Sequence, residues 1–292
     1  MKKRTKLLVI ACAMVLLCGA GLFLWKEPQS VYVAMAYLGI GEEKTLMQPG
    51  TPGDLLSKTL EELAEDPWVT IDQSMMLVSE KYVIPDSFEW SISAYKDTDV
   101  QMNTCIQNAY MQLAERVKEA TGERLLISSA YRTEEKQQEL YREEPTTANA
   151  PGTSEHQTGL ALDVYVKYYA SYGFLKSDAG KYINSNCWRD GFIIRYPVYG
   201  KGETGVKYEP WHLRYVGQPH AKVIYNNHLT LEEYLESLEY GKWYRVDDYW
   251  ISRQNLEEGT LQLPQHDTQA VISPDNTGSY IVTVRMGGSD IS

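Results

Sequence analysis

Residues 150–163 read APGTSEHQTGLALD. In this stretch the imidazole of His156 precedes a short apolar run that ends on the carboxylate of Asp163. Between His156 and Asp163, Gly159 allows a tight turn, and the residues after it are apolar, as in a buried strand. An ionised carboxylate that is buried alone is very costly, so Asp163 must be paired or bound to a metal ion. The stretch therefore predicts a buried strand with a polar site at its end.

Further strand and helix signals surround this stretch. Strands are expected at 124–130, 159–166, 192–196 and 209–216, and helices at 99–121, 134–144, 177–189, 219–227 and 231–240. Gly122 and Gly191 follow two of these helices as stop signals, and Thr133 and Thr230 precede two others as N-caps. We expect a mixed fold built from both kinds of element.

Composition and charge narrow the class of protein. The 292 residues are 43% hydrophobic and 11% aromatic, which is typical of a globular chain. With 28 basic and 39 acidic residues the net charge is −11, and no basic stripe follows the first few residues. This balance argues against a nucleic-acid partner.

Residues 1–26 have the pattern of a membrane anchor. Basic residues at positions 2, 3, 4 and 6 precede an uninterrupted apolar run from Leu7 to Trp25. The run is long enough to cross a bilayer, and its basic flank should stay in the cytoplasm. A cleaved signal peptide and lipidation at Cys18 are alternatives, but no good cleavage site follows Ala13, and Leu17 is not the small residue that lipidation favours. We expect a single-pass cell-membrane protein whose bulk is extracytoplasmic.

The rest of the chain divides into three parts. Residues 27–76 are turn-rich and are expected to form a stalk or linker, residues 77–240 the main domain, and residues 241–292 a small β appendage. An oxidising compartment would permit a disulfide between Cys105 and Cys187, although two separate buried thiols are the simpler expectation.

A second histidine motif suggests what compensates Asp163. The segment YEPWHLRYVG (208–217) places Glu209 shortly before His212. Two histidines and one carboxylate, here His156, Asp163 and His212, form a three-ligand zinc set that leaves a fourth position for water. Zinc lowers the pKa of such a water to about 7, and a carboxylate that does not bind the metal, here Glu209, can take the water's proton.

Each of these residues also has a simpler interpretation. A lone histidine on a strand is more often part of a hydrogen-bonded core. Asp163 can cap a helix or pair with an arginine such as Arg132, and Glu209 can be a solvated edge residue. The simpler interpretation weakens because all of its parts must hold at once. The other histidines have no partners at ligand spacing and are expected at the surface: His220, His228 and His266.

Four motifs occur in one order, namely SSAYRT (128–133), GTSEHQTGLALDV (152–164), GFIIRYP (191–197) and YEPWHLRYVG (208–217). Together they resemble the VanY-type D-alanyl-D-alanine carboxypeptidases of the M15 zinc peptidase family, over residues 77–240. The resemblance implies an α+β fold of the hedgehog/D,D-peptidase-like kind, a small antiparallel sheet flanked by helices. It also implies that residues 77–240 are a zinc D,D-carboxypeptidase domain.

The resemblance further implies a set of ligands for one zinc ion, namely His156, Asp163 and His212. Glu209 would be the catalytic base, and Arg132 would stabilise the oxyanion because its guanidinium can place two donors on one oxygen. Gln137 and Ser154 match family positions that hold the terminal D-alanine. Where the family has S-G-Y-R, this chain has Ala130 in place of the glycine, which bears on substrate fit.

The implied function is removal of the terminal D-alanine from peptidoglycan precursor stem peptides that end in D-Ala-D-Ala, with a part in glycopeptide (vancomycin) resistance. A bifunctional D,D-dipeptidase/carboxypeptidase or an L,D-carboxypeptidase would use the same metal set. Loops around the site, with the tyrosine-rich segment 166–178 as a candidate rim, would decide which peptide enters. A non-catalytic wall-binding protein is disfavoured because the full ligand set and base are present.

Overall fold

The structure is a computed structural model that describes residues 33–35, 37–38, 43–86, 88–256, 259–265 and 269–286. The expected anchor, residues 1–26, lies outside this set. Within the set, we find no helix that is both long enough and apolar enough to span a membrane. Residues Glu42–Ser292 form one compact unit, and its elements carry the candidate site.

The helices of this unit are α3 (Leu60–Glu65), α4 (Gln107–Thr121), α5 (Glu134–Glu143), α6 (Asp178–Asn186), α7 (Lys201–Thr204), α8 (His220–Asn226) and α9 (Leu231–Ser237), with 3-10 turns η1 (Thr104–Ile106), η2 (Glu155–Thr158), η3 (Ser171–Lys176) and η4 (Cys187–Asp190). The strands are β1 (Gln48–Gly50), β2 (Leu55–Thr59), β3 (Val69–Ile71), β4 (Ile92–Ala94), β5 (Gln101–Asn103), β6 (Leu126–Ser129), β7 (Ala161–Tyr165), β8 (Phe192–Ile194), β9 (His212–Tyr215), β10 (Trp243–Val246), β11 (Tyr249–Gln254), β12 (Thr260–Pro264), β13 (Gln269–Pro274) and β14 (Tyr280–Arg285).

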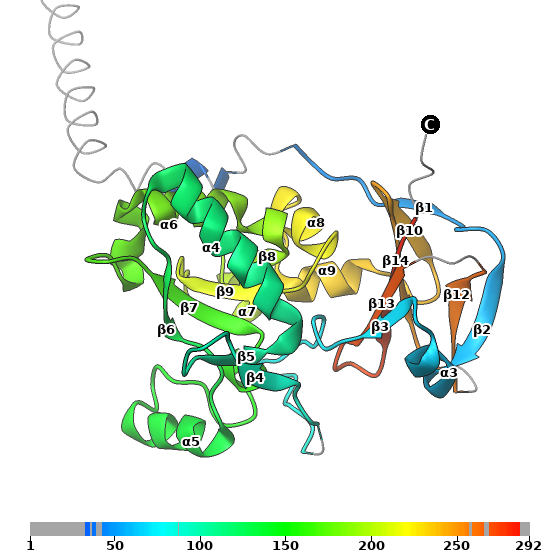
Figure 1. Cartoon of the computed structure of the whole chain (residues 1–292), viewed down its shortest axis with the longest axis horizontal. Coiled ribbons are helices and arrows are strands. Elements are labelled where there is room, and N and C mark those ends of the chain that lie inside the picture. Colours follow the sequence, from blue (N-terminus) through cyan, green and yellow to red (C-terminus); the bar gives the residue numbers. More distant parts are fainter. Residues whose placement is uncertain are drawn as a thin grey trace, which may run out of the picture. The chain divides into compact units, whose positions relative to one another are not determined.

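A four-stranded sheet in the order β6-β7-β9-β8 forms the centre of the main domain, and all its pairs are antiparallel. Side chains alternate between its faces, because successive residues of a strand point to opposite sides. Leu162, Val164 and Leu213 pack into a core with α4, which crosses the sheet (Figure 1). Asp163 and His212 therefore lie on the other face. The predicted antiparallel sheet with flanking helices is confirmed.

The expected helix at 99–121 is shorter than predicted. Residues 101–103 form β5, and α4 begins only at Gln107 after the turn η1. Asn103 causes the change, because its side-chain oxygen accepts from Cys105 N and its amide donates to Gln73 Oε1 at 2.8 Å. These bonds hold the backbone of residue 103 in the extended conformation. Gly122 ends α4 in the left-handed conformation, as expected.

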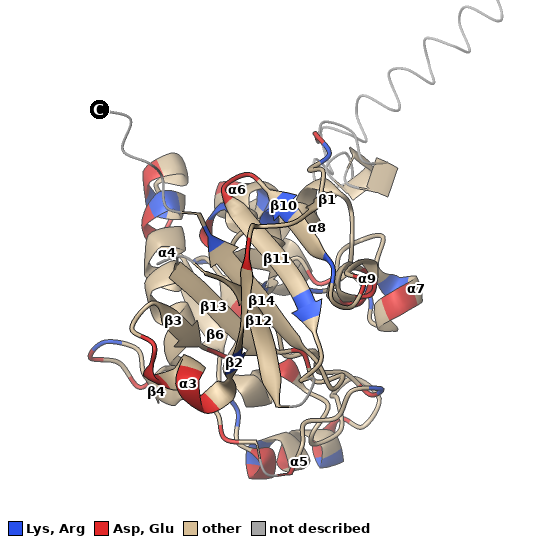
Figure 2. Cartoon of the chain, turned by 90° about the vertical axis from the view of Figure 1, so that its right-hand side faces the viewer, with Lys and Arg blue, Asp and Glu red and all other residues tan. Residues whose placement is uncertain are grey.

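A second sheet, in the order β1-β10-β11-β14-β13-β3, combines segments from both ends of the unit. Within this sheet, strands β13 and β14 are almost free of charged residues, whereas helix α5 of the main domain carries both acidic and basic residues (Figure 2). The residues expected as a stalk differ from that expectation, because 48–50 and 69–71 lie in this sheet and 55–59 pair with β12. Leu63 is fully buried against the C-terminal strands, so this segment has core contacts that a linker would lack.

The position of His220 in helix α8 contradicts the prediction for this histidine. His220 was expected at the surface but is buried. Its Nδ1 lies 2.6 Å from the Tyr234 hydroxyl and its Nε2 lies 2.8 Å from Thr283 Oγ1, so α8, α9 and β14 meet at this ring. His228 is half-buried, and His266 lies outside the described residues. Cys105 and Cys187 are both free thiols, but only Cys187 is buried as expected, and Cys105 is half-buried.

Candidate active site

The site is assembled by the register of three strands. Ser129 of β6 lies opposite Asp163 of β7, and Asp163 lies opposite His212 of β9. His156 lies in the turn η2, which ends at Gly159 with a φ of 67°. A Cβ on Gly159 would lie 2.7 Å from the backbone N of Asn103, so only glycine permits this turn between the motif's histidine and its aspartate.

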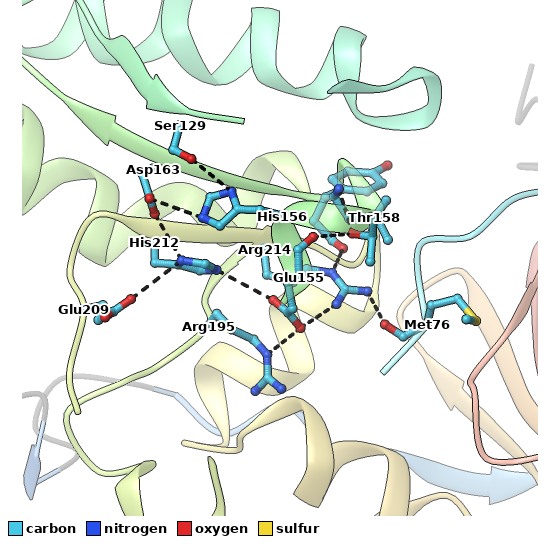
Figure 3. A network of polar contacts seen from close by, with 12 residues as sticks. Met76, Ser129, Glu155, His156, Thr158, Asp163, Arg195, Glu209, His212 and Arg214 are labelled. Carbon is cyan, nitrogen blue, oxygen red and sulfur yellow. Dashed lines mark hydrogen bonds and ion pairs between the residues drawn. The ribbon is translucent and has the colours of Figure 1, made fainter. Parts of the chain in front are cut away.

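The three predicted ligands converge (Figure 3). His156 Nε2 lies 3.2 Å from Asp163 Oδ2, and His212 Nδ1 lies 3.1 Å from Asp163 Oδ1. One ligand atom from each residue fits within 4.8 Å of the others. The structure thus brings together the two histidines and the carboxylate that the sequence motifs singled out.

The chemistry of these side chains suits a metal ion. His156 Nδ1 lies 2.8 Å from the Ala130 carbonyl, which leaves Nε2 for the site. Asp163 Oδ1 is buried and has no hydrogen-bond partner among the described residues. Burial would raise the pKa of Asp163, but the adjacent His156 and His212 rings hold that pKa well below its usual range. Two imidazole nitrogens and one carboxylate oxygen are ligands that zinc favours.

Glu209 lies beside this cluster without belonging to it. A turn in which His212 N donates to the Glu209 carbonyl at 3.1 Å folds the chain back, as expected for a segment with Pro210 at its bend. Glu209 Oε2 then lies 3.6 Å from His212 Nδ1. Burial raises the pKa of Glu209, and the nearby charge of Asp163 raises it further while His212 lowers it. A carboxylate with a raised pKa is thus held next to the candidate metal position.

Arg132 and Gln137 form a pair at the edge of the site. Arg132 Nη1 donates to Gln137 Oε1 at 2.6 Å, and Nη2 donates to Ser129 Oγ at 2.9 Å. Gln137 is buried, and its amide donates to the Asn149 carbonyl at 2.6 Å. Gln137 therefore orients Arg132. Ser154 is buried just before η2 and does not cap it, so its predicted role in substrate binding stays a prediction, as does that of Gln137.

Three buried charges behind the histidines were not predicted. Glu155, Arg195 and Arg214 are almost fully buried, and Glu155 accepts from both arginines (Figure 3). The signal was present in the segments FIIRY and HLRY, where an arginine interrupts an apolar strand. A buried guanidinium needs a carboxylate partner, so these two arginines could have pointed to a buried acid.

Comparisons with known proteins identify the family. A family model described as VanY, D-alanyl-D-alanine carboxypeptidase, matches residues 99–218. A D-alanyl-D-alanine carboxypeptidase of Enterococcus faecalis is 33% identical over 217 residues, which cover 67% of this chain and 72% of the relative. The chain belongs to the VanY family of D-alanyl-D-alanine carboxypeptidases.

Solved VanY structures agree with this result. The vancomycin-resistance D,D-pentapeptidase VanY of a VanB-type cassette, solved as a mutant with Zn(II), is 32% identical, with a TM-score of 0.50 over 56% of this chain and 98% of that one. VanYB in complex with D-alanine-D-alanine is 33% identical, with a TM-score of 0.51 over 57% of this chain and 99% of that one. As a VanY-family member, the chain is a metallocarboxypeptidase with a mixed α/β fold.

Proposed function

We propose that the chain is a zinc-dependent D,D-carboxypeptidase that removes the terminal D-alanine from peptidoglycan precursor stem peptides ending in D-Ala-D-Ala. The observation that carries the proposal is the convergence of His156, Asp163 and His212 with Glu209 beside them. Family membership supports the reaction, and the VanY relatives named with Zn(II) and with D-alanine-D-alanine support the ion and the substrate class.

His156 Nε2, His212 Nδ1 and an oxygen of Asp163 would hold one zinc ion. When bound, the ion supplies a Lewis acid for the scissile carbonyl and lowers the pKa of water at the site to about 7. Asp163 offers an anionic ligand because its pKa is held low. The three-ligand set leaves room for substrate, as in other catalytic zinc sites.

Glu209 would act as the general base and then as the general acid. Its carboxylate accepts a proton from the attacking water and later passes it to the amine of the departing D-alanine. A general base works best when its pKa lies near the working pH, and burial moves the pKa of Glu209 in that direction. Its position 3.6 Å from His212 Nδ1 keeps it beside the reacting atoms.

Arg132 would stabilise the negative charge that develops on the scissile carbonyl oxygen. Its guanidinium presents N–H groups in a planar fork, and Gln137 and Ser129 hold two of its nitrogens. Preorganised donors of this kind stabilise the transition state more than the ground state. Gln137 and Ser154 would take part in binding the terminal D-alanine.

An assay of D-alanine release tests the proposal. Full-length protein in detergent would be given a stem pentapeptide, a stem tetrapeptide and free D-Ala-D-Ala, in chelated and zinc-restored samples. We expect zinc-dependent release from the pentapeptide that is lost in Glu209→Ala. Equal release from the free dipeptide would indicate a bifunctional enzyme, and release from the tetrapeptide alone an L,D-carboxypeptidase. No release from any substrate would refute the proposal.

We further propose that residues 1–26 anchor the protein in the cell membrane with the catalytic domain outside the cytoplasm, and that it contributes to glycopeptide resistance. The basic residues before the apolar run Leu7–Trp25 support the orientation. Accessibility of a C-terminal tag to external protease in intact cells tests the topology. Vancomycin sensitivity of a strain expressing Glu209→Ala in place of the wild type tests the contribution.

A further inference from the structure

His212 places its two ring nitrogens against different acidic groups. Nδ1 faces Asp163 and Glu209, while Nε2 faces Glu155 Oε2 at 3.8 Å on the opposite side (Figure 3). Both His212 Nε2 and Glu155 Oε2 are buried, and neither has a hydrogen-bond partner within the described ranges. We propose that Glu155 is a positioning residue that fixes the ring orientation and tautomer of His212, so that Nδ1 is the nitrogen presented to the metal.

Glu155 is itself held rigidly. Its Oε1 accepts from Arg195 Nε at 2.7 Å and from Arg214 Nη1 at 2.6 Å. Arg195 is tied in turn to both carboxylate oxygens of Glu232 on α9, and Arg214 Nη2 donates to the carbonyls of Ser74 and Met76. Two arginines therefore fix one oxygen of Glu155 and leave the other directed at His212.

The charges of this group balance, because two arginines face two glutamates at short distance. Arg195 Nε and Arg214 Nη1 lie 2.7 Å and 2.6 Å from Glu155 Oε1, and a guanidinium group is always positively charged, so two cations contact this carboxyl group. Glu155 thus stays a carboxylate. A carboxylate can only accept hydrogen bonds, so Oε2 can be satisfied only by a group that carries a proton.

This requirement selects one tautomer of His212. When the ring is neutral, Glu155 favours the form with its proton on Nε2, which leaves the lone pair of Nδ1 for a metal ion. The separation of 3.8 Å is longer than a hydrogen bond, and such contacts often shorten when a site is loaded. His156 is oriented by a different group, the Ala130 carbonyl, so the two histidine ligands have separate supports.

The substitution Glu155→Gln tests the inference. It keeps an oxygen for the arginines but directs an amide N–H at Nε2, which favours a proton on Nδ1 and blocks metal binding there. We expect zinc affinity to fall by about 10–100-fold, measured by competition with a chromogenic chelator. The matched control is Glu232→Gln, which also removes a negative charge from Arg195 but does not touch His212. Zinc affinity should be unchanged in this control.

The inference rests on the metal site of the proposed function, and the outcomes separate the two. Zinc binding by the wild type together with equal affinities in Glu155→Gln overturns the inference alone. Equal losses in Glu155→Gln and Glu232→Gln also overturn it, because they indicate a general effect of the ion cluster. If the wild type binds no zinc, the proposed function fails as well.

A second measurement does not depend on a folded variant. In the zinc-loaded wild type with ¹⁵N-labelled histidine, we expect His212 to show a slowly exchanging Nε2–H proton and a metal-bound Nδ1. A metal-bound Nε2 in the same spectrum would overturn the inference.

Discussion

Two buried histidines show how differently two regions of this molecule accommodate polar groups. Around His212, on the four-stranded sheet, three carboxylates lie within 3.8 Å of the ring. Burial alone would lower the pKa of His212, but the carboxylates of Asp163, Glu155 and Glu209 beside the ring raise it to about 10. Around His220, between α8 and β14, both ring nitrogens face neutral hydroxyl groups, and burial lowers the pKa to about 3.

This difference in polar surroundings distinguishes a functional site from a structural contact. Tyr234 and Thr283 satisfy His220, and a fully satisfied neutral group makes a region rigid without making it reactive. The cluster at His212 instead concentrates negative charge and leaves buried polar atoms without hydrogen-bond partners. Such a cluster contributes little to the stability of the fold, but it suits the binding of a cation. We therefore expect substitutions in the first region to change chemistry and those in the second to change stability.

The largest expected contrast comes from one substitution made at both histidines. His212→Gln should abolish zinc binding and D-alanine release, because it removes one of three ligands. His220→Gln should keep both properties and lower the free energy of unfolding by about 1–3 kcal/mol, because a buried hydrogen bond is lost. Metal analysis, the release assay and urea denaturation of both variants give the answer. Loss of zinc in His220→Gln would contradict the purely structural role assigned to His220.

Glu209→Gln should lower kcat by about 10²–10⁴-fold with zinc content unchanged, because it removes the general base but no ligand. Asp190→Asn is the matched control. Asp190 is a buried carboxylate whose pKa is also raised by burial, but it pairs with Arg116 at 2.9 Å and does not take part in the site. The control should lose stability and keep its kcat. Loss of zinc in Glu209→Gln would instead make Glu209 a ligand.

Arginines in the two regions should respond differently to replacement by lysine. Arg132→Lys keeps the charge but loses the planar fork, so kcat should fall by about 10²-fold with little change in unfolding. Arg253→Lys should do the opposite, because Arg253 joins Asp275, Thr277 and the Leu235 carbonyl within the structure. Steady-state kinetics and thermal unfolding of the two variants test this expected difference. Equal kinetic effects would remove the distinction.

The smallest effect concerns acid stability. His220 has a pKa of about 3 when folded and about 6.5 when unfolded. As the pH falls below 6.5 the unfolded chain takes up a proton that the folded protein does not, so stability present above pH 6.5 is lost toward pH 3. Between pH 6.5 and 5.0 the loss is about 2 kcal/mol. Denaturation at both pH values should show this loss in the wild type and not in His220→Gln.

The metal trio could be predicted from the sequence because its chemistry lies in two short motifs, GTSEHQTGLALDV and YEPWH. The register that places Asp163 opposite His212 could not be predicted, because pairing depends on strands distant in sequence. Glu155 was missed for a related reason, since Arg195 and Arg214 reach it from two separate strands. His220 has no local pattern that distinguishes a packed ring from a surface ring.

The terminal segments of the unit were the least predictable part. Residues 48–71 lack a long apolar periodicity, and their partners come from strands near the other end of the chain. The small appendage expected at 241–292 is part of a larger arrangement, which also includes strands that precede the peptidase motifs.

The pairing of β3 with β13 and of β2 with β12 also sets the order in which the chain can fold. The strands of the catalytic sheet all lie within residues 126–215, so they can pair without the C-terminal segment. Strands β2 and β3 instead need β12 and β13, about 200 residues further along the chain, and contacts of such long range form slowly. Until then their edges are open to pairing with other chains. The final strands therefore protect the earliest ones, and shortening the C-terminus should promote aggregation of nascent chains before it affects catalysis.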